Sequence, residues 1–129
     1  MKENKSKENI LELINKINDD PDVLHLDYTP AVHQLSTYGI DAAIAVLPLL
    51  DSEDIWERYR AQRVIEGVVQ RIYGWQPGQG YPKASDGEEK IKKLFLQLGN
   101  YQANSSTENR KASIQKWDKW LKEKQKNNG

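Results

Sequence analysis

The stretch that most constrains the fold lies between residues 37 and 69. Within it, residues 42–50 are hydrophobic on nearly every side of a helix, and a helix of that kind has to be surrounded by protein. A short acidic turn at residues 51–54 follows, and then a long amphipathic segment over residues 53–73. This order predicts two antiparallel helices, and it places the first of them at the centre of the molecule.

Other apolar periodicities predict helices before this pair. One stripe of a first amphipathic helix consists of Ile10, Leu13, Ile14 and Ile17. Thr29 followed by Pro30 is typical of a helix start, because the hydroxyl can cap the helix and proline needs no donor at its first position. Pro48 lies inside the apolar segment, so we expect a kink or looser hydrogen bonding there.

The long helix and the C-terminal half carry their own start signals. We expect Ser52 or Asp51 to cap the long helix. Residues 85–88 and 105–108 each have the Ser-x-x-Glu spacing of a capping box, and apolar stripes follow both. Between them, residues 74–87 form a loop rich in glycine and proline. No convincing strand alternation is present, so the sequence predicts an all-α fold of about six helices.

The helix pair resembles a HEAT repeat of the short bacterial kind, with Arg58, Ala61 and Ile65 at the positions of its Arg-x-x-Ala-x-x-x-Leu pattern. The arginine can pair with the acidic turn. The C-terminal segment is similar to a tail that often follows bacterial HEAT repeats; the residues that carry this similarity are Gly99, Tyr101, Arg110, Ile114, Trp117 and Trp120. A length of 129 residues suits a single domain over residues 1–129, and the resemblance implies that it is built as a short α-solenoid or antiparallel helix bundle. The polar segments 1–8 and 124–129 are predicted to be frayed tails.

Composition excludes several classes of function. The chain has no cysteine, so disulfides and thiolate chemistry are absent. Its formal net charge is zero, whereas a protein that lives on nucleic acid usually carries a basic excess. No apolar run is long enough to span a bilayer and no secretion signal is recognisable, so we expect a cytoplasmic protein. No nucleophile motif, phosphate loop, cofactor fingerprint or metal-ligand spacing is present, which favours a non-enzymatic protein without cofactor or metal.

The expected function is binding of another protein. Trp56 lies opposite the apolar stripe of the long helix with Arg60 and Arg63 beside it, and Trp75 and Tyr81 flank the 74–87 loop. Aromatic residues and arginines are the usual anchors of protein interfaces, so these five residues are the candidate contacts. The alternative is that the 74–87 loop or another helix covers Trp56 and that the loop aromatics only anchor the loop onto the helices.

A second hypothesis is association with nucleic acid or another anionic partner through the last helix. Lys111, Lys116, Lys119 and Lys122 lie opposite its apolar stripe. A lysine face of this kind is more often simply solvated. A third hypothesis is a lyase-like or chaperone accessory that holds a chromophore-bearing or cofactor-bearing subunit, because related short repeats occur in such proteins.

Overall fold

The computed structural model describes residues 2–83 and 85–128, and the side chains of all of these except 2–4 and 128. The helices are α1 Lys2–Asn15, α2 Pro30–Ser36, α3 Ile40–Val46, the 3₁₀ helix η1 Leu47–Asp51, α4 Ile55–Ile72, α5 Gly87–Gln97 and α6 Thr107–Asn128. Within these residues there are six α-helices and no strand. The prediction of an all-α fold with about six helices is therefore confirmed.

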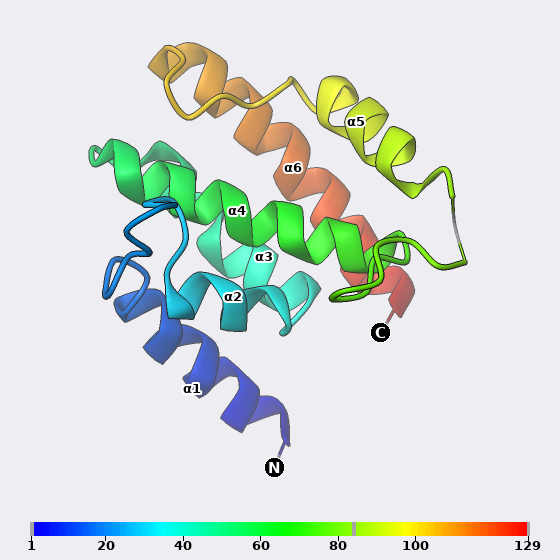
Figure 1. Ribbon diagram of the computed structural model, residues 1–129. Helices are drawn as coiled ribbons and strands as arrows, with labels where there is room; N and C mark the ends of the chain where they lie inside the picture. The colour runs from blue at the N-terminus through cyan, green and yellow to red at the C-terminus, as the bar shows by residue number, and fades with distance from the viewer. Residues whose placement is uncertain (1, 84, 129) are drawn as a thin grey trace.

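The helices pack around α3 and α4 (Figure 1). Helix α4 contacts α2, α3 and η1, while α6 covers the other side of α3 and η1. Helix α1 packs on α2 and α3, so α1 and α6 lie on opposite sides of the bundle. Helix α5 lies at the periphery and contacts α4.

The core forms where the sequence predicted it. Ala42, Ala43 and Val46 of α3 are completely buried, which confirms that the apolar helix is central. The buried stripe of α4 consists of Ala61, Val64, Ile65, Val68 and Val69. Small alanine side chains let neighbouring helices approach closely, and the branched side chains of α4 fill the space between them.

Helices α2 and α4 meet closely at Gly67. A Cβ atom built on Gly67 would lie 2.4 Å from Ser36 Oγ and 2.8 Å from Ser36 Cβ. Ser36 is buried and donates a hydrogen bond to the Val32 carbonyl at 3.0 Å. Glycine is therefore required at this position by the approach of α2, since the helical backbone of α4 is regular there.

Pro48 changes the helix in the expected way. The α-helix stops at Val46, and the chain continues as the 3₁₀ helix Leu47–Asp51 with Pro48 in its first turn. A 3₁₀ helix tolerates proline at its start because the missing donor is not needed there. Leu47 and Leu50 are buried, so this segment still contributes to the core.

The predicted capping of α4 was wrong. Asp54, and neither Ser52 nor Asp51, occupies the N-cap, and its Oδ1 accepts a hydrogen bond from the Trp56 amide at 2.9 Å. The Ser52 hydroxyl instead accepts from the Asp54 amide at 3.1 Å, which shapes the preceding turn. The N-cap shift moves the start of the helix to Ile55, two residues beyond the expected position.

The expected partner of Arg58 was also wrong. Arg58 donates to two backbone carbonyls, from Nε to Ala103 at 2.8 Å and from an NH1 group to Ser52 at 2.6 Å. The acidic turn is bound by Arg110, whose guanidinium lies 3.3 Å from Asp51. Arg58 thus ties the turn before α4 to the segment between α5 and α6, and Arg110 ties it to the first turns of α6.

The later helix starts also differ slightly from the sequence predictions. Helix α6 begins at Thr107, and the Ser106 hydroxyl, in place of Ser105, accepts from the Asn109 amide at 3.2 Å. Helix α5 begins at Gly87 after Asp86, with no side-chain cap. The terminal segments 1–8 and 124–129 were predicted to be frayed; residues 2–8 and 124–128 are helical, as parts of α1 and α6, and residues 1 and 129 lie outside the described residues.

Candidate binding surface along helix α4

Three hollows follow one another along the outward side of α4. Most of the α4 residues that line them are spaced by three or four positions and therefore share one face: Trp56, Tyr59, Arg63, Glu66, Gly67, Gln70 and Arg71. Arg63 lines the first and second hollows, and Gln70 lines the second and third. The outward side of α4 is thus a continuous, uneven groove.

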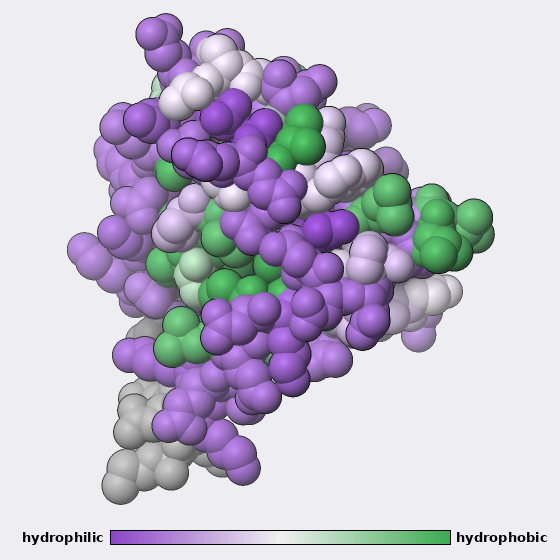
Figure 2. Space-filling model, turned by 90° about the vertical axis from the view of Figure 1, so that its left-hand side faces the viewer, coloured by the Kyte–Doolittle hydropathy of each residue, from purple (hydrophilic) through white to green (hydrophobic). Residues whose placement is uncertain are grey.

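The first hollow lies between α4 and the loop that joins α1 to α2. It has a volume of about 440 Å³, and its loop wall consists of Val23, Leu24, His25, Leu26 and Asp27. Three loop side chains and one from α4 form what we call the loop–Trp56 patch; their exposed fractions are 88% for Val23, 83% for Leu24, 43% for Leu26 and 41% for Trp56. Figure 2, which views the molecule from this side, shows hydrophobic side chains protruding at one edge of a largely hydrophilic surface.

Arg60 holds this loop onto α4. It donates from Nε to the Leu26 carbonyl at 3.0 Å and from NH1 to Asn18 Oδ1 at 2.9 Å. Its guanidinium also lies 5.9 Å from the centre of the Trp56 ring. Only 7% of Arg60 is exposed, so its role in the structure is to anchor the loop.

Arg63 lies between the first two hollows and is held by two carboxylates. Its Nε is 2.5 Å from Asp27 Oδ2, and its NH1 is 2.9 Å from Glu66 Oε2. Burial alone would lower the pKa of Arg63, but the negative charges of Glu66 and Asp27 outweigh it and raise the pKa. Burial raises the pKa of Glu66, and the opposing effect of Arg63 is smaller. The site thus keeps Arg63 charged at the cost of desolvating Glu66.

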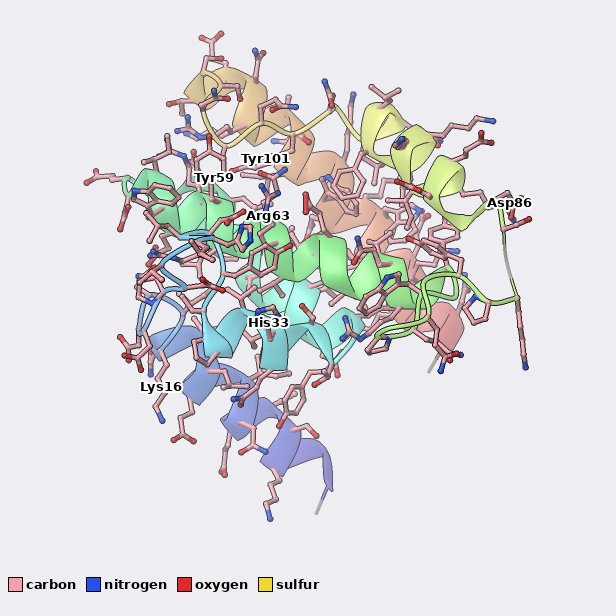
Figure 3. The ribbon with its side chains drawn as sticks, viewed as in Figure 1. Lys16, His33, Tyr59, Arg63, Asp86 and Tyr101 are labelled. Atoms are coloured by element: carbon pink, nitrogen blue, oxygen red, sulfur yellow. The ribbon has the colours of Figure 1, made fainter. Side chains whose placement is uncertain are left out.

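The second hollow, which we call the Arg71 pocket, is enclosed by α2, α4 and Trp75. Its volume is about 350 Å³, and it is lined by Tyr28, His33, Ser36, Arg63, Gly67, Gln70, Arg71 and Trp75. The Arg71 guanidinium lies over the Trp75 ring, 5.0 Å from its centre. The Tyr28 and His33 rings stack on each other with their centres 5.1 Å apart. Figure 3 labels two of the walls, His33 on α2 and Arg63 on α4.

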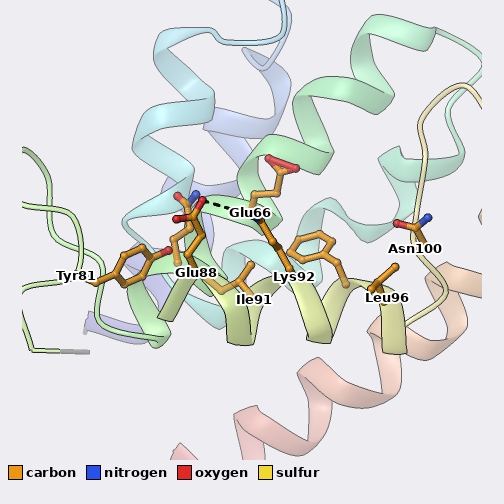
Figure 4. Close-up of a pocket in the computed structure, with 9 residues that line it drawn as sticks. Glu66, Tyr81, Glu88, Ile91, Lys92, Leu96 and Asn100 are labelled. Atoms are coloured by element: carbon orange, nitrogen blue, oxygen red, sulfur yellow. Dashed lines mark ion pairs between the residues drawn. The ribbon is translucent and has the colours of Figure 1, made fainter. Parts of the chain in front are cut away.

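The third hollow separates α4 from α5 and has a volume of about 450 Å³. Figure 4 shows Tyr81 and Glu88 at one end of it and Asn100 at the other. Tyr81 packs against Gly87, where an added Cβ would lie 2.5 Å from the tyrosine ring. Burial and the nearby Glu88 charge both raise the pKa of Tyr81. Tyr81 therefore fastens the start of α5, as expected if the aromatics anchor their loop.

The five candidate contact residues are divided among these hollows. Trp56 lies in the first, Arg63 between the first and second, Trp75 in the second and Tyr81 in the third. Arg60 lies beneath the loop. Residues 18–28 partly cover the side of α4 that carries Trp56, although the sequence had suggested the 74–87 loop or a helix for this role.

Val23, Leu24, Leu26 and Arg71 also line these hollows, but the sequence pattern did not indicate them as candidate contacts. The three loop residues belong to a segment without helical or strand periodicity, so no pattern indicated which side they face. The signal that was available is the presence of large aliphatic residues among aspartates, where a solvated loop usually has polar ones.

The lysine face of α6 is exposed. Lys111, Lys116, Lys119 and Lys122 are all solvent-accessible, and Lys122 pairs with Asp118 on the next turn at 3.1 Å. Lys124 lies 5.3 Å from the centre of the Trp120 ring. These contacts lie along the helix and do not gather the lysines into a hollow.

The geometry contains no preformed metal centre in the part of the chain described, because no three His, Asp or Glu side chains there are grouped to hold an ion. None of the helices over residues 2–83 and 85–128 combines the length and hydrophobicity that a membrane crossing requires. Comparisons with protein-family models, with curated proteins and with solved structures found no match.

Proposed function

We propose that this chain is a non-catalytic, protein-binding module of HEAT-like helices, and that it contacts its partner through the loop–Trp56 patch. The observation that carries the proposal is the exposure of Val23, Leu24, Leu26 and Trp56 around one hollow. Monomeric proteins seldom expose large apolar side chains in such a group, and groups of this kind mark interaction sites. The resemblance to HEAT repeats adds a helical architecture that holds such surfaces in place.

The chemistry of the patch defines the kind of partner surface. Val23, Leu24 and Leu26 offer aliphatic contacts, while the Trp56 indole adds a flat wall that packs against Tyr59 with ring centres 5.7 Å apart. Full burial of one such side chain contributes roughly 1.5–3 kcal/mol. A protein that inserts apolar side chains into the hollow would therefore gain most of its affinity from the loop and Trp56.

The experiment compares a charged double variant and an uncharged single variant with the native chain. The partner is first isolated by co-purification from the native host and then purified. Val23→Asp with Leu24→Asp places two charges in the patch, and we expect binding to the purified partner to weaken by at least about tenfold, the equivalent of 1.4 kcal/mol. Trp56→Ala should also weaken binding, while the melting temperature stays nearly unchanged because Trp56 is substantially exposed.

Leu11→Asp is the matched control, because Leu11 is an exposed aliphatic residue on α1 that lines none of the three hollows. It should bind the partner as the native chain does. Equal binding by the native chain and the Val23/Leu24 variant, or an equal loss in the Leu11 control, would contradict the proposed surface.

A further inference from the structure

We infer that the Arg71 pocket binds a carboxylate attached to a small aromatic group. The pocket lies beyond the loop–Trp56 patch, and the inference does not depend on the proposed protein-binding function. It stands on the charges that line the pocket, on the donors that Arg71 leaves free, and on the flat walls beside them.

The charged side chains that line the pocket are arginines. Arg63 and Arg71 contribute to the lining, and no Asp or Glu is among the described residues that form it. The two carboxylates that bind Arg63 lie outward in neighbouring hollows, since Asp27 lines the first and Glu66 the third. Among the residues described, Arg71 forms no ion pair. The pocket therefore presents a cation whose charge the neighbouring side chains leave uncompensated.

The donors of Arg71 are arranged for a carboxylate. One NH1 group donates to the Gly67 carbonyl at 3.2 Å, and one face of the guanidinium lies over Trp75. These contacts fix the plane of the guanidinium, and the edge formed by Nε and NH2 has no acceptor among the residues that the structure describes. Two parallel N–H donors on that edge match the two oxygens of a carboxylate.

The remaining walls suit a flat apolar group. Trp75 is on one side, and the stacked pair of Tyr28 and His33 is on another. A volume of about 350 Å³ lies within the range of pockets that hold small organic molecules. A ring placed against these aromatics, with its carboxylate on Arg71, would use both the apolar and the cationic parts of the pocket.

The probe for this site is sodium benzoate, followed in ¹H–¹⁵N spectra at the indole N–H of Trp75. Trp75→Phe assigns that signal by removing it. We expect a saturable shift of the signal with benzoate up to about 50 mM, a range suited to a weak site. Benzamide has the same ring without the charge, and it should cause a much smaller shift.

Two variants test the role of Arg71. Arg71→Gln should weaken benzoate binding at least about tenfold, because a charge-assisted pair of hydrogen bonds is lost. Arg71→Lys keeps the charge without the paired donors, so its affinity for benzoate should lie between those of the native chain and Arg71→Gln. Lys119→Gln removes a distant exposed charge from α6 and should leave binding unchanged. Circular dichroism checks that each variant keeps its helices, and Arg71→Lys serves as the test if Arg71→Gln does not fold.

The carboxylate could be a free metabolite or the end of a partner chain. A short peptide that ends in phenylalanine distinguishes these sources, and its C-terminal amide shows whether the peptide binds through its carboxylate. Tighter binding of the free-acid peptide than of benzoate indicates a chain end. Tighter binding of benzoate indicates a small molecule. Absence of a saturable benzoate shift, an equal response to benzamide, or unchanged binding in a folded Arg71 variant would overturn the inference.

Discussion

Tyr101 shows how one hydroxyl joins distant parts of the chain. Its side chain is buried, and its hydroxyl donates to the Leu50 carbonyl at 2.5 Å, across 51 positions in sequence. Close by, Arg58 donates to backbone carbonyls and Arg110 pairs with Asp51. These contacts fasten the end of η1 to the segment before α6 and to α6 itself. Burial raises the pKa of Tyr101 to about 12.

This pKa predicts a loss of stability in alkali. The unfolded tyrosine ionises near pH 10, whereas the folded one keeps its proton to about pH 12, so the unfolded state releases a proton first. The free energy of unfolding should therefore fall as pH rises from 10 to 12, by roughly 2–3 kcal/mol from this group. Urea unfolding at pH 9 and pH 11 measures the change.

Tyr101→Phe is the control for this effect. It should be less stable at pH 9 by about 1 kcal/mol, because the hydrogen bond to Leu50 is lost. The difference between the two proteins should shrink at pH 11, because the variant lacks the titrating group. A constant difference across this range would show that Tyr101 does not titrate in this way. Tyr28 and Tyr81 also have raised pKa values, but they contribute equally to both proteins.

At the scale of elements, the change in stability caused by Gly67→Ala has opposite signs for two effects, helix propensity and the contact between α2 and α4. Helix propensity alone says that Gly67→Ala stabilises α4 by up to about 1 kcal/mol. The new Cβ would lie 2.4 Å from Ser36 Oγ, which forces α2 and α4 apart and costs about 1–3 kcal/mol. We expect net destabilisation in urea unfolding.

A double-mutant cycle with Ser36→Gly tests the cause. Removing the Ser36 side chain opens space for the new methyl group, so the double variant should be more stable than the sum of the single changes predicts. Additive effects, or stabilisation by Gly67→Ala alone, would mean that the two helices are not in the close contact described.

The anchored loop gives a second prediction at this scale. Arg60→Lys keeps a positive charge but replaces the two donor nitrogens that reach Leu26 and Asn18 with a single one on a differently shaped side chain. Amide exchange should accelerate for Asp22 and Tyr28, whose N–H groups bond within the loop. Arg71→Lys on the same helix is the control. Equal exchange rates in the two variants would show that Arg60 does not anchor the loop.

The elements show where sequence reasoning succeeds. Apolar periodicity located α1, α4 and α6 because a buried stripe repeats along each of them. Helix starts were less certain, since Ser52 and Asp54 are both good caps and the choice depends on how Arg58 and Arg110 bind the turn. The path of residues 18–28 could not be predicted, because Arg60 fixes it from a distant position in sequence.

At the scale of the whole molecule, α6 is expected to hold the bundle together. Trp117 is almost fully buried, and the centre of its ring lies 4.9 Å from that of Phe95 and 5.8 Å from that of Trp120. Trp117→Ala should reduce the free energy of unfolding by about 3–5 kcal/mol. Because α6 covers both α3 and η1, we expect far-ultraviolet circular dichroism and tryptophan fluorescence to report one shared transition.

Leu96→Ala supplies the comparison for this prediction. Leu96 is exposed on α5, so the change should alter stability by less than about 0.5 kcal/mol. If Trp117→Ala were as mild as Leu96→Ala, or if it melted α6 separately from α4, the molecule would behave as independent units.

The candidate surface was harder to predict than the fold. A core obeys local periodicity, whereas the three hollows arise where α4 meets three separate segments, the 18–28 loop, α2 and α5. The sequence singled out Trp56, Arg63, Trp75 and Tyr81, and it placed Trp56 and Arg63 outside the buried stripe of the long helix, where the structure also has them. It could not show that Arg63 pairs with Asp27 and Glu66, whereas Arg71 has no carboxylate partner among the described residues.

The two hydrogen bonds from Arg60 have a consequence for recognition. A loop that is already immobilised loses little backbone freedom when another molecule touches it, so less of the contact energy is spent on ordering. Encounter would then resemble rigid docking, with similar shapes before and after contact. Loosening the loop would slow productive capture even though every apolar side chain on it remained.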